Sequence, residues 1–236
     1  ANFQQLLAGE RIYKEHQSVV VQTLGDKPSD ETLAPLIRHC CKMATGSGKT
    51  VVMAMLLVWS FCNRGRKQSD KRFPSTALIV CPNLTIKNRL SVLNPADKNN
   101  YYDKFDLVPG NLKQELKKGK IISVNWHKLG KESPNSEGGK TYRVVQKGEE
   151  SPEAFARRIL KTGYDDGEIL VINDEAHHAY RPNVSSGKNL TPQQLEATVW
   201  VEGLDMINAA CGIRLCVDLS ATPFFLQGSG YREGTP

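Results

Sequence analysis

The chain of 236 residues is 39% hydrophobic and 24% charged, a composition typical of a folded globular protein rather than of a disordered one. Its formal net charge of +6 permits an anionic partner but does not demonstrate one. The longest apolar run, residues 51–62, is too short to span a bilayer, and no signal peptide opens the chain, so we expect no association with a membrane.

The six cysteines stand at positions 40, 41, 62, 81, 211 and 216. They form no CxxC pair, and several lie inside apolar runs such as ALIVC and IRLCVDL. Buried free thiols in a reducing cytosol are therefore expected, rather than disulfides or zinc ligands. We accordingly predict a cytoplasmic protein.

Strand-like and helix-like segments alternate along the chain after residue 35. Apolar stretches rich in strand formers predict strands at residues 36–44, 76–81, 121–126, 168–174 and 213–220. Helices are predicted at residues 49–63, 83–93, 111–118, 152–162 and 192–210. Near-continuous apolar strands separated by helices favour an α/β fold, with a mainly parallel central sheet covered on both faces. Right-handed crossovers then place the loops that follow the strands on one edge of the sheet.

Two segments interrupt this alternation. Residues 128–150 and 181–191 are rich in glycine, serine, proline, asparagine and lysine. Loops this long in a compact domain are usually functional or mobile. We therefore interpret both as surface insertions into the central fold.

The stretch MATGSGKT, residues 43–50, lies between the first predicted strand and the first predicted helix. Gly46 and Gly48 allow the backbone to curl so that successive N–H groups point at phosphate oxygens, and the helix N-terminus adds a favourable dipole. Lys49 is expected to meet the β- and γ-phosphates of a nucleotide, and the Thr50 hydroxyl to bind Mg²⁺.

The strict form of this phosphate-binding motif has a glycine where Met43 stands. A flexible turn leading into a helix is the plain alternative. The order of strand, loop and apolar helix favours the nucleotide site, which includes Ser47 together with its neighbours in the loop.

The stretch ILVINDEAHHAY, residues 169–180, is an apolar strand that ends in two carboxylates and two imidazoles. Asp174 is predicted on the Mg²⁺ side of a nucleotide, and Glu175 is predicted to polarise a water in line with the γ-phosphate. We therefore expect Lys49, Asp174 and Glu175 to converge on one site sized for a triphosphate.

This stretch has two other interpretations. Adjacent histidines can indicate zinc, but helical zinc sites place two histidines four residues apart with a glutamate between them, and that spacing is missing. The acidic pair can also be a plain solvated strand end. Its occurrence downstream of a phosphate loop favours nucleotide hydrolysis.

With MATGSGKT, NDEAHHAY and LSATPFF in this order, residues 40–225 resemble the first motor domain of superfamily 2 helicases and translocases. The closest similarity is to the restriction-subunit branch, that of type III restriction enzymes. The resemblance implies a three-layer RecA-like P-loop NTPase domain that hydrolyses ATP with Mg²⁺ while holding nucleic acid, in this branch duplex DNA. By position, residues 46–50 match motif I, residues 174–177 match motif II, the DEAH box, and residues 220–222 match motif III.

Motif III in this family couples hydrolysis to strand movement, which implies a coupling role for Ser220 and Thr222. The resemblance also implies that His177 forms a hydrogen bond towards motif III and reports the state of the γ-phosphate. A structural histidine is the alternative at that position.

The stretches LIVCPNLTIKNRL and SVNWHKL resemble motifs Ia and Ib, whose loops touch the sugar-phosphate backbone in the family. The candidate contacts are Asn83, Thr85, Lys87, Arg89, Asn125 and His127. A solvated helix face is the alternative for Lys87 and Arg89. Such contacts would be largely independent of base sequence.

Upstream, YKEHQSVVVQTL resembles the glutamine motif that reads adenine, with Gln17 as the candidate and a helix-surface glutamine as the alternative. We expect residues 1–35 to form an N-terminal helical segment, residues 36–225 the motor domain, and residues 226–236 a linker towards a second RecA-like domain. The resemblance implies that this second domain supplies an arginine finger, so little ATP turnover is expected from this piece alone. A nuclease domain and a methyltransferase or specificity subunit are further implied partners.

Four functions are open at this point: a DNA-translocating ATPase lobe, an RNA-remodelling DEAH-type helicase lobe, a non-catalytic nucleotide-gated interaction module, and a small-molecule kinase. Lys49, Asp174 and Glu175 argue against the non-catalytic module, because a retired motor tends to lose one of them. Motif III and the basic surface argue against the kinase. We favour the DNA-translocating lobe.

Overall fold

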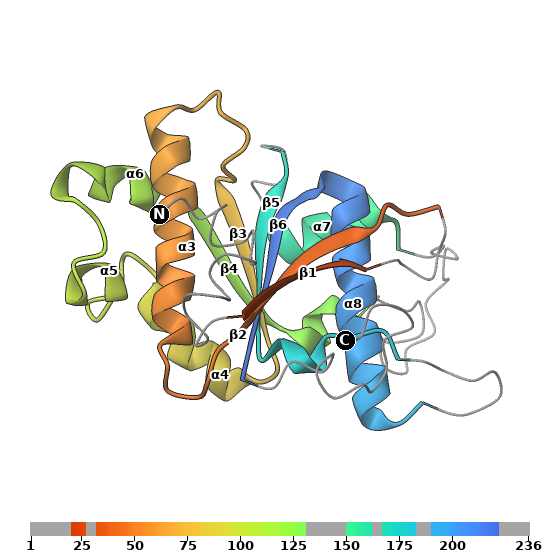
Figure 1. The fold of residues 1–236 in the computed structure, drawn as a ribbon. Helices are drawn as coiled ribbons and strands as arrows, with labels where there is room; N and C mark the ends of the chain where they lie inside the picture. Colours follow the sequence, from red (N-terminus) through yellow and green to blue (C-terminus); the bar gives the residue numbers. More distant parts are fainter. Residues whose placement is uncertain (1–19, 27–31, 131–149, 162–166, 183–189, 222–236) are drawn as a thin grey trace, which may run out of the picture.

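The computed structural model describes residues 20–26, 32–130, 150–161, 167–182 and 190–221. At its centre lies a six-stranded sheet with the strand order β1-β2-β6-β5-β3-β4 (Figure 1). The strands are β1 (Val20–Asp26), β2 (Leu36–Lys42), β3 (Thr76–Cys81), β4 (Lys120–Asn125), β5 (Ile169–Asp174) and β6 (Ile213–Ser220). Strands β2 to β6 run parallel, and β1 lies antiparallel to β2 at one edge, which confirms the mainly parallel sheet.

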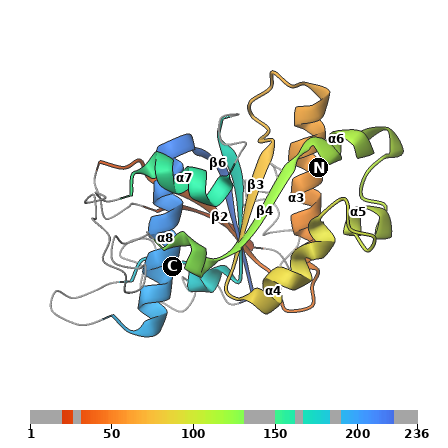
Figure 2. The ribbon, with the colours of Figure 1, turned by 180° about the vertical axis from the view of Figure 1, so that it is seen from behind.

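Helices cover both faces of the sheet, so the molecule has three layers (Figures 1 and 2). On one face lie α3 (Lys49–Arg66), α4 (Leu84–Arg89), α5 (Tyr101–Lys104) and α6 (Lys113–Lys118). On the other face lie α7 (Pro152–Leu160) and α8 (Pro192–Cys211). The 3-10 turns are η1 (Leu90–Leu93), η2 (Gly110–Leu112), η3 (Trp126–Leu129) and η4 (Ala176–His178). Within the described part of the chain, none of the helices has the length and apolar character needed to cross a membrane.

The five predicted strands are all present, with ends that differ from the prediction by at most two residues. The helix predicted over residues 83–93 is instead α4 followed by the 3-10 turn η1, and the segment predicted over residues 111–118 begins within η2. Helix α5 was not predicted, because its four residues are too few for a helical periodicity to show in the sequence.

The N-terminal prediction is wrong at residues 20–26, which form β1 rather than part of a helical segment. β1 pairs with β2 in an antiparallel register that joins Val20 to Lys42 and Asp26 to Leu36. The stretch VVQTLGD is rich in β-branched residues, which favour a strand when a neighbouring edge is available for pairing. The sheet therefore begins before residue 36. Residues 1–19 and 27–31, with Gln17 among them, lie outside the described residues.

Two hydrophobic cores lie on opposite faces of the sheet. β3 and β5 are buried along their whole length, as expected for central parallel strands with helices on both sides. Alternate residues of β5 serve the two cores, because successive strand side chains point to opposite faces. Ile172 packs in the core that contains Phe61 of α3, whereas Val171 packs with Phe155 of α7 and Trp200 of α8.

Close packing between α6, α3 and β4 leads to a prediction for stability. Gly119 follows α6, and a Cβ added there would overlap the ring of Phe61, which is 1% exposed. Gly119→Ala is therefore expected to lower the free energy of unfolding by about 1–3 kcal/mol, measured by urea denaturation.

Gly110→Ala is the matched control, because a Cβ added at Gly110 meets no heavy atom within 4 Å. Its expected change is no more than about 0.5 kcal/mol. Equal stabilities of the two variants would show that the contact between Gly119 and the Phe61 ring does not limit the packing of this layer.

Candidate functional site

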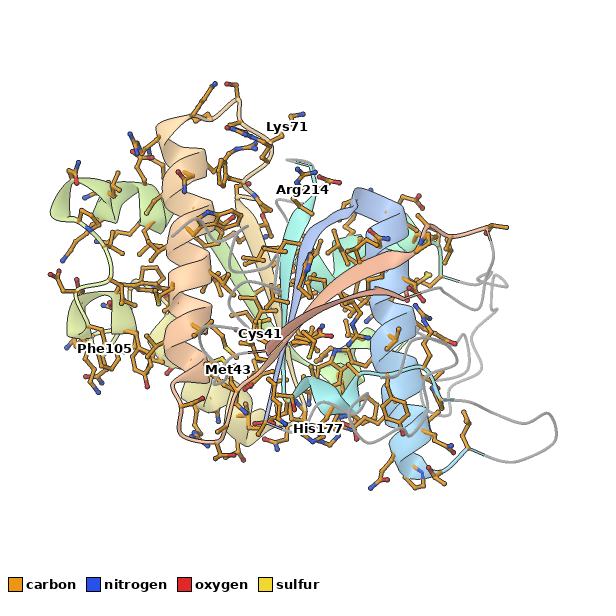
Figure 3. All side chains as sticks on the ribbon, in the orientation of Figure 1. Cys41, Met43, Lys71, Phe105, His177 and Arg214 are labelled. Atoms are coloured by element: carbon orange, nitrogen blue, oxygen red, sulfur yellow. The ribbon has the colours of Figure 1, made fainter. Side chains whose placement is uncertain are left out.

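The parallel strands bring the predicted motifs to one edge of the sheet, because β2, β3, β4, β5 and β6 all end there. The phosphate loop follows β2, and the acidic pair ends β5. In Figure 3, Met43 and His177 both lie towards this end of the sheet. Ligands of open parallel sheets bind at the carboxyl ends of the strands, so a ligand site is expected at this edge.

The phosphate loop begins as a continuation of β2. The N–H of Met43 donates a hydrogen bond to the carbonyl of Ser220 at 2.8 Å, which extends the pairing of β2 with β6 beyond Lys42. The Met43 side chain is 7% exposed and belongs to the core on the α3 face. The glycine of the strict motif is therefore replaced here by a residue that contributes to packing.

The loop turns into α3 through two glycines with positive φ. Gly46 has φ 80° and Gly48, the N-cap of α3, has φ 92° and ψ 29°, a left-handed conformation that glycine adopts without steric cost. The Ser47 N–H and hydroxyl both donate to the Ala44 carbonyl, at 3.1 and 2.7 Å, and hold the turn. Lys49 and Thr50 are consequently the first two residues of α3, an 18-residue helix.

At the end of β5, Glu175 points towards the phosphate loop. Its backbone is left-handed, with φ 50° and ψ 48°, which is uncommon for a residue other than glycine and is typical of functional sites. The Glu175 Oε1 lies 2.7 Å from the Lys49 Nζ, a contact that joins residues 126 positions apart. The structure thus brings together the lysine of the loop and the glutamate of the acidic strand end.

Asp174 is the last residue of β5 and is 7% exposed. Burial raises the pKa of the Asp174 carboxyl, and the neighbouring Glu175 carboxylate raises it further. The charges of Lys49 and Arg89 oppose this and favour the ionised form. A carboxylate in this setting gains from any additional cation close to it, because the cation offsets both the burial and the like charge.

His177 lies between the acidic pair and β6. Its Nδ1 is 3.0 Å from the Ser220 Oγ and 3.6 Å from the Glu175 Oε2. Burial lowers the pKa of the His177 imidazole, and the adjacent His178 lowers it further, which favours the neutral ring despite the opposing effect of Glu175. A neutral ring can donate to or accept from the Ser220 hydroxyl, depending on its tautomer. Thr222, the other coupling candidate, lies outside the described residues.

The candidate nucleic-acid contacts follow β3 and β4 on the same edge. Asn83 caps α4, where its side-chain oxygen accepts from the Ile86 N–H at 2.9 Å. Asn125 ends β4, and the His127 ring in η3 stacks on Trp126 with 3.7 Å between centroids. The remaining candidates, Thr85, Lys87 and Arg89, lie on α4, which is only six residues long.

Sequence reasoning missed a buried polar cluster directly behind this edge. Arg38 of β2 pairs with Asp218 of β6, and Asn173 of β5 donates to the same aspartate. The Trp200 indole of α8 donates to the Asn173 side-chain oxygen at 3.0 Å. The sequence did offer an indication, because Arg38 and Asp218 lie inside the largely apolar strands LIRHCCK and IRLCVDLS. Charged residues at such positions are buried only when they are paired.

The donor set fits Mg²⁺ bound together with phosphates. Among the described residues, no group of three or more histidines, cysteines, aspartates and glutamates is arranged to hold a metal by itself. Mg²⁺ at nucleotide sites needs only one or two protein oxygens, with phosphates and water completing its shell. Thr50 and Asp174 each carry an oxygen of this kind, and they stand next in the chain to Lys49 and Glu175, which meet at 2.7 Å.

Comparison with known proteins gives one match. The family model described as type III restriction enzyme, res subunit, matches residues 12–225. Neither a curated protein nor a solved structure matches the chain.

Proposed function

Because the chain belongs to the family of the type III restriction enzyme res subunit, we propose that its motor domain hydrolyses ATP with Mg²⁺ in order to translocate along duplex DNA. Membership of this family makes the chain a helicase-like ATPase motor domain. We further propose that the nucleic acid is duplex DNA and that individual residues have the roles given below.

The observation that carries the proposal is the contact between Lys49 and Glu175. An ammonium at the start of a helix and a carboxylate at the end of a strand meet at 2.7 Å, with side chains that are 12% and 28% exposed. The desolvation of a largely buried ion pair offsets much of its attraction, so stability is a weak reason for building one across two glycine turns and a left-handed glutamate. The arrangement suits a pair that separates when phosphates bind.

In the proposed binding step, Lys49 leaves Glu175 and meets the β- and γ-phosphates. The backbone N–H groups of residues 46 and 48–50 donate to phosphate oxygens, with the dipole of α3 in support, while the Ser47 N–H holds the turn through the Ala44 carbonyl. Thr50 and Asp174 would hold Mg²⁺, which when bound would offset negative charge on the phosphates and favour the ionised carboxylate of Asp174.

In the proposed hydrolysis step, Glu175 acts on water. Once Lys49 has moved to the phosphates, the Glu175 carboxylate is free to orient a water and accept its proton as the water attacks the γ-phosphate. The bond between the γ-phosphorus and the bridging oxygen breaks in the same step, and ADP leaves with that oxygen. The left-handed backbone at Glu175 turns the chain sharply after β5. That turn aims the side chain at the phosphate loop instead of continuing along the strand.

Ser220 is suited to couple this chemistry to motion. Its carbonyl accepts from the Met43 N–H at the entry to the phosphate loop, and its hydroxyl contacts the His177 ring. One residue therefore touches both of the segments that hold the nucleotide in the proposal. We assign Ser220 and Thr222 the transmission of the nucleotide state towards the nucleic acid, with His177 as the reporter of that state.

Nucleic acid is proposed to lie along the edge formed by the ends of β3 and β4. Polar groups there can donate to phosphate oxygens and position the strand without reading its sequence. The proposed contacts are Asn83, Thr85, Lys87, Arg89, Asn125 and His127. A second RecA-like domain, a nuclease domain and a methyltransferase or specificity subunit are proposed as partners in the intact enzyme, and the adenine is assigned to Gln17.

The test is ATPase activity of the complete enzyme with different polynucleotides. Duplex DNA is expected to stimulate hydrolysis at least about tenfold, whereas single-stranded RNA of equal length stimulates little, because the proposed motor moves on DNA and each tenfold step corresponds to about 1.4 kcal/mol in the barrier. Stronger stimulation by RNA would identify an RNA-remodelling motor. ATP binding without hydrolysis under either condition would identify a nucleotide-gated interaction module.

A further inference from the structure

Arg38 is a fully buried arginine in the middle of β2. Its Nη2 lies 2.7 Å from the Asp218 Oδ2, and its Nε donates to the same oxygen at 2.8 Å. The same Nη2 also donates to the Ala179 carbonyl at 2.7 Å. A single nitrogen atom therefore connects β6 to the chain just after η4.

The carboxylate of Asp218 is held on its other side as well. Its Oδ1 accepts from the Asn173 Nδ2 at 2.7 Å, and the Asn173 oxygen accepts from the Trp200 indole. The cluster thus spans β2, β5, β6 and α8. Each of the three strands leads directly into a segment of the candidate site.

The contacts of Arg38 lie close in the chain to His177 and Ser220, the two residues proposed to transmit the nucleotide state. Ala179 comes two residues after His177, and Asp218 comes two residues before Ser220 on the same face of β6. The contacts form a closed ring, in which His177 meets Ser220 at one point and Arg38 joins Ala179 to Asp218 at the opposite point. Because Arg38 fixes the distance between Ala179 and Asp218, it also restricts the distance between His177 and Ser220.

We propose that Arg38 is a positioning residue for ATP hydrolysis, which holds η4 against β6 so that His177 and Ser220 stay in contact. The proposal rests on the proposed function, because it matters for catalysis only if His177 and Ser220 transmit the state of a bound nucleotide. Arg38 acts through the segment of η4 and Ala179, and it does not itself touch the Lys49–Glu175 pair.

Burial of this ion pair is poorly explained by stability alone. Buried ion pairs are often neutral or even destabilising compared with well-packed apolar residues of the same size. The planar guanidinium offers what apolar residues lack, namely several donors in a fixed geometry that can address two acceptors at once. Arg38 uses that geometry on acceptors from two different segments.

The test reads the contact between His177 and Ser220 directly. The protein is labelled with ¹⁵N-histidine, and the two ring-nitrogen signals of His177, assigned by their loss in His177→Gln, are recorded at pH 8. In the parent, a Ser220 hydroxyl held against Nδ1 in one donor–acceptor sense favours one tautomer of the ring, so the two nitrogen signals are expected to be widely separated. The paired change Arg38→Met with Asp218→Asn removes both buried charges, while an amide at position 218 still offers an oxygen to Asn173.

In the paired variant the two His177 signals are expected to converge, because a freed ring exchanges between tautomers. Arg38→Lys, which keeps the charge for Asp218 but lacks the planar fork, is expected to give the same convergence with a smaller loss of melting temperature. If the paired variant does not fold, Arg38→Lys decides the question. Widely separated signals in a folded Arg38 variant would overturn the proposal, and so would converged signals in the parent.

Arg158→Met is the matched control. Like Arg38, Arg158 binds both a carboxylate and backbone carbonyls: it pairs with Glu150 and donates to the carbonyls of Lys128 and Gly130. Unlike Arg38, it does not contact η4 or the residue that follows it. Its loss should leave the His177 signals separated; convergence in this control would overturn the specific role of Arg38. ATP affinity is measured on the same samples, so failure of the parent to bind ATP would contradict the proposed function independently of the histidine spectra.

Discussion

Lys49→Ala is expected to weaken ATP binding by about 30-fold or more, since truncating one member of a largely buried charge pair costs about 2–5 kcal/mol. The change removes the ammonium proposed to meet the β- and γ-phosphates. It also leaves the Glu175 carboxylate without the partner found 2.7 Å away, so that a second negative charge faces the incoming phosphates. Isothermal titration of the chain with ATP and Mg²⁺ measures the effect.

Lys113→Ala is the matched control for this experiment. Lys113 also pairs with a carboxylate, that of Asp103 at 2.6 Å, but the pair is exposed on α5 and α6. Exposed pairs contribute little, so this variant should bind ATP with the parental affinity. Parental affinity in Lys49→Ala would contradict the phosphate-binding role of the loop.

Glu175→Gln is expected to separate binding from chemistry. The amide has the same shape as the carboxylate but cannot accept the proton of the attacking water, so kcat of the complete enzyme should fall by about 10²–10⁴-fold. ATP affinity should stay within roughly fivefold of the parental value, or about 1 kcal/mol, because Glu175 is not proposed to contact the phosphates and the amide oxygen can still accept from Lys49 in place of the ion pair. Release of Lys49 from that pair favours tighter rather than weaker binding.

Steady-state hydrolysis and ATP titration are measured for this variant alongside Glu196→Gln. Glu196 is a glutamate of α8 whose Oε1 lies 3.3 Å from the Nδ1 of His178, so the control removes a nearby carboxylate that has no proposed part in the chemistry. Its kcat should remain parental. If Glu175→Gln hydrolysed ATP at the parental rate, another group would have to activate the water.

Much of the fold could be predicted from local pattern. The apolar run that became β3 was placed with its exact ends, because a strand buried on both faces is apolar throughout and stands out from its flanks. β6 was also placed with its exact ends, although Arg214 and Asp218 interrupt its apolar run. The turn into α3 was predictable from Gly46 and Gly48, since the left-handed backbone found at both strongly favours glycine. β1 was missed because a strand at an edge depends on the neighbour with which it pairs.

The site was predictable only as far as its residue types. Asp174 and Glu175 were recognised from their place at the end of an apolar strand, yet nothing local indicates that Glu175 adopts a left-handed backbone. Arg38 and Asp218 were passed over, because their significance depends on a contact between residues 180 positions apart. The sequence alone does not show whether a charged residue within a strand has an ion-pair partner in the folded protein.

The amino-acid sequence by itself determined the alternation of strands and helices, the curl of the phosphate loop and the family to which the chain belongs. These features depend on side-chain periodicity and on single-residue backbone preferences, which act over a few neighbouring positions. The tertiary structure decided that β2 lies beside β6 and β6 beside β5. That strand order brings Lys49 to Glu175 and His177 to Ser220, because hydrogen-bonded pairing of strands joins segments that no local pattern relates.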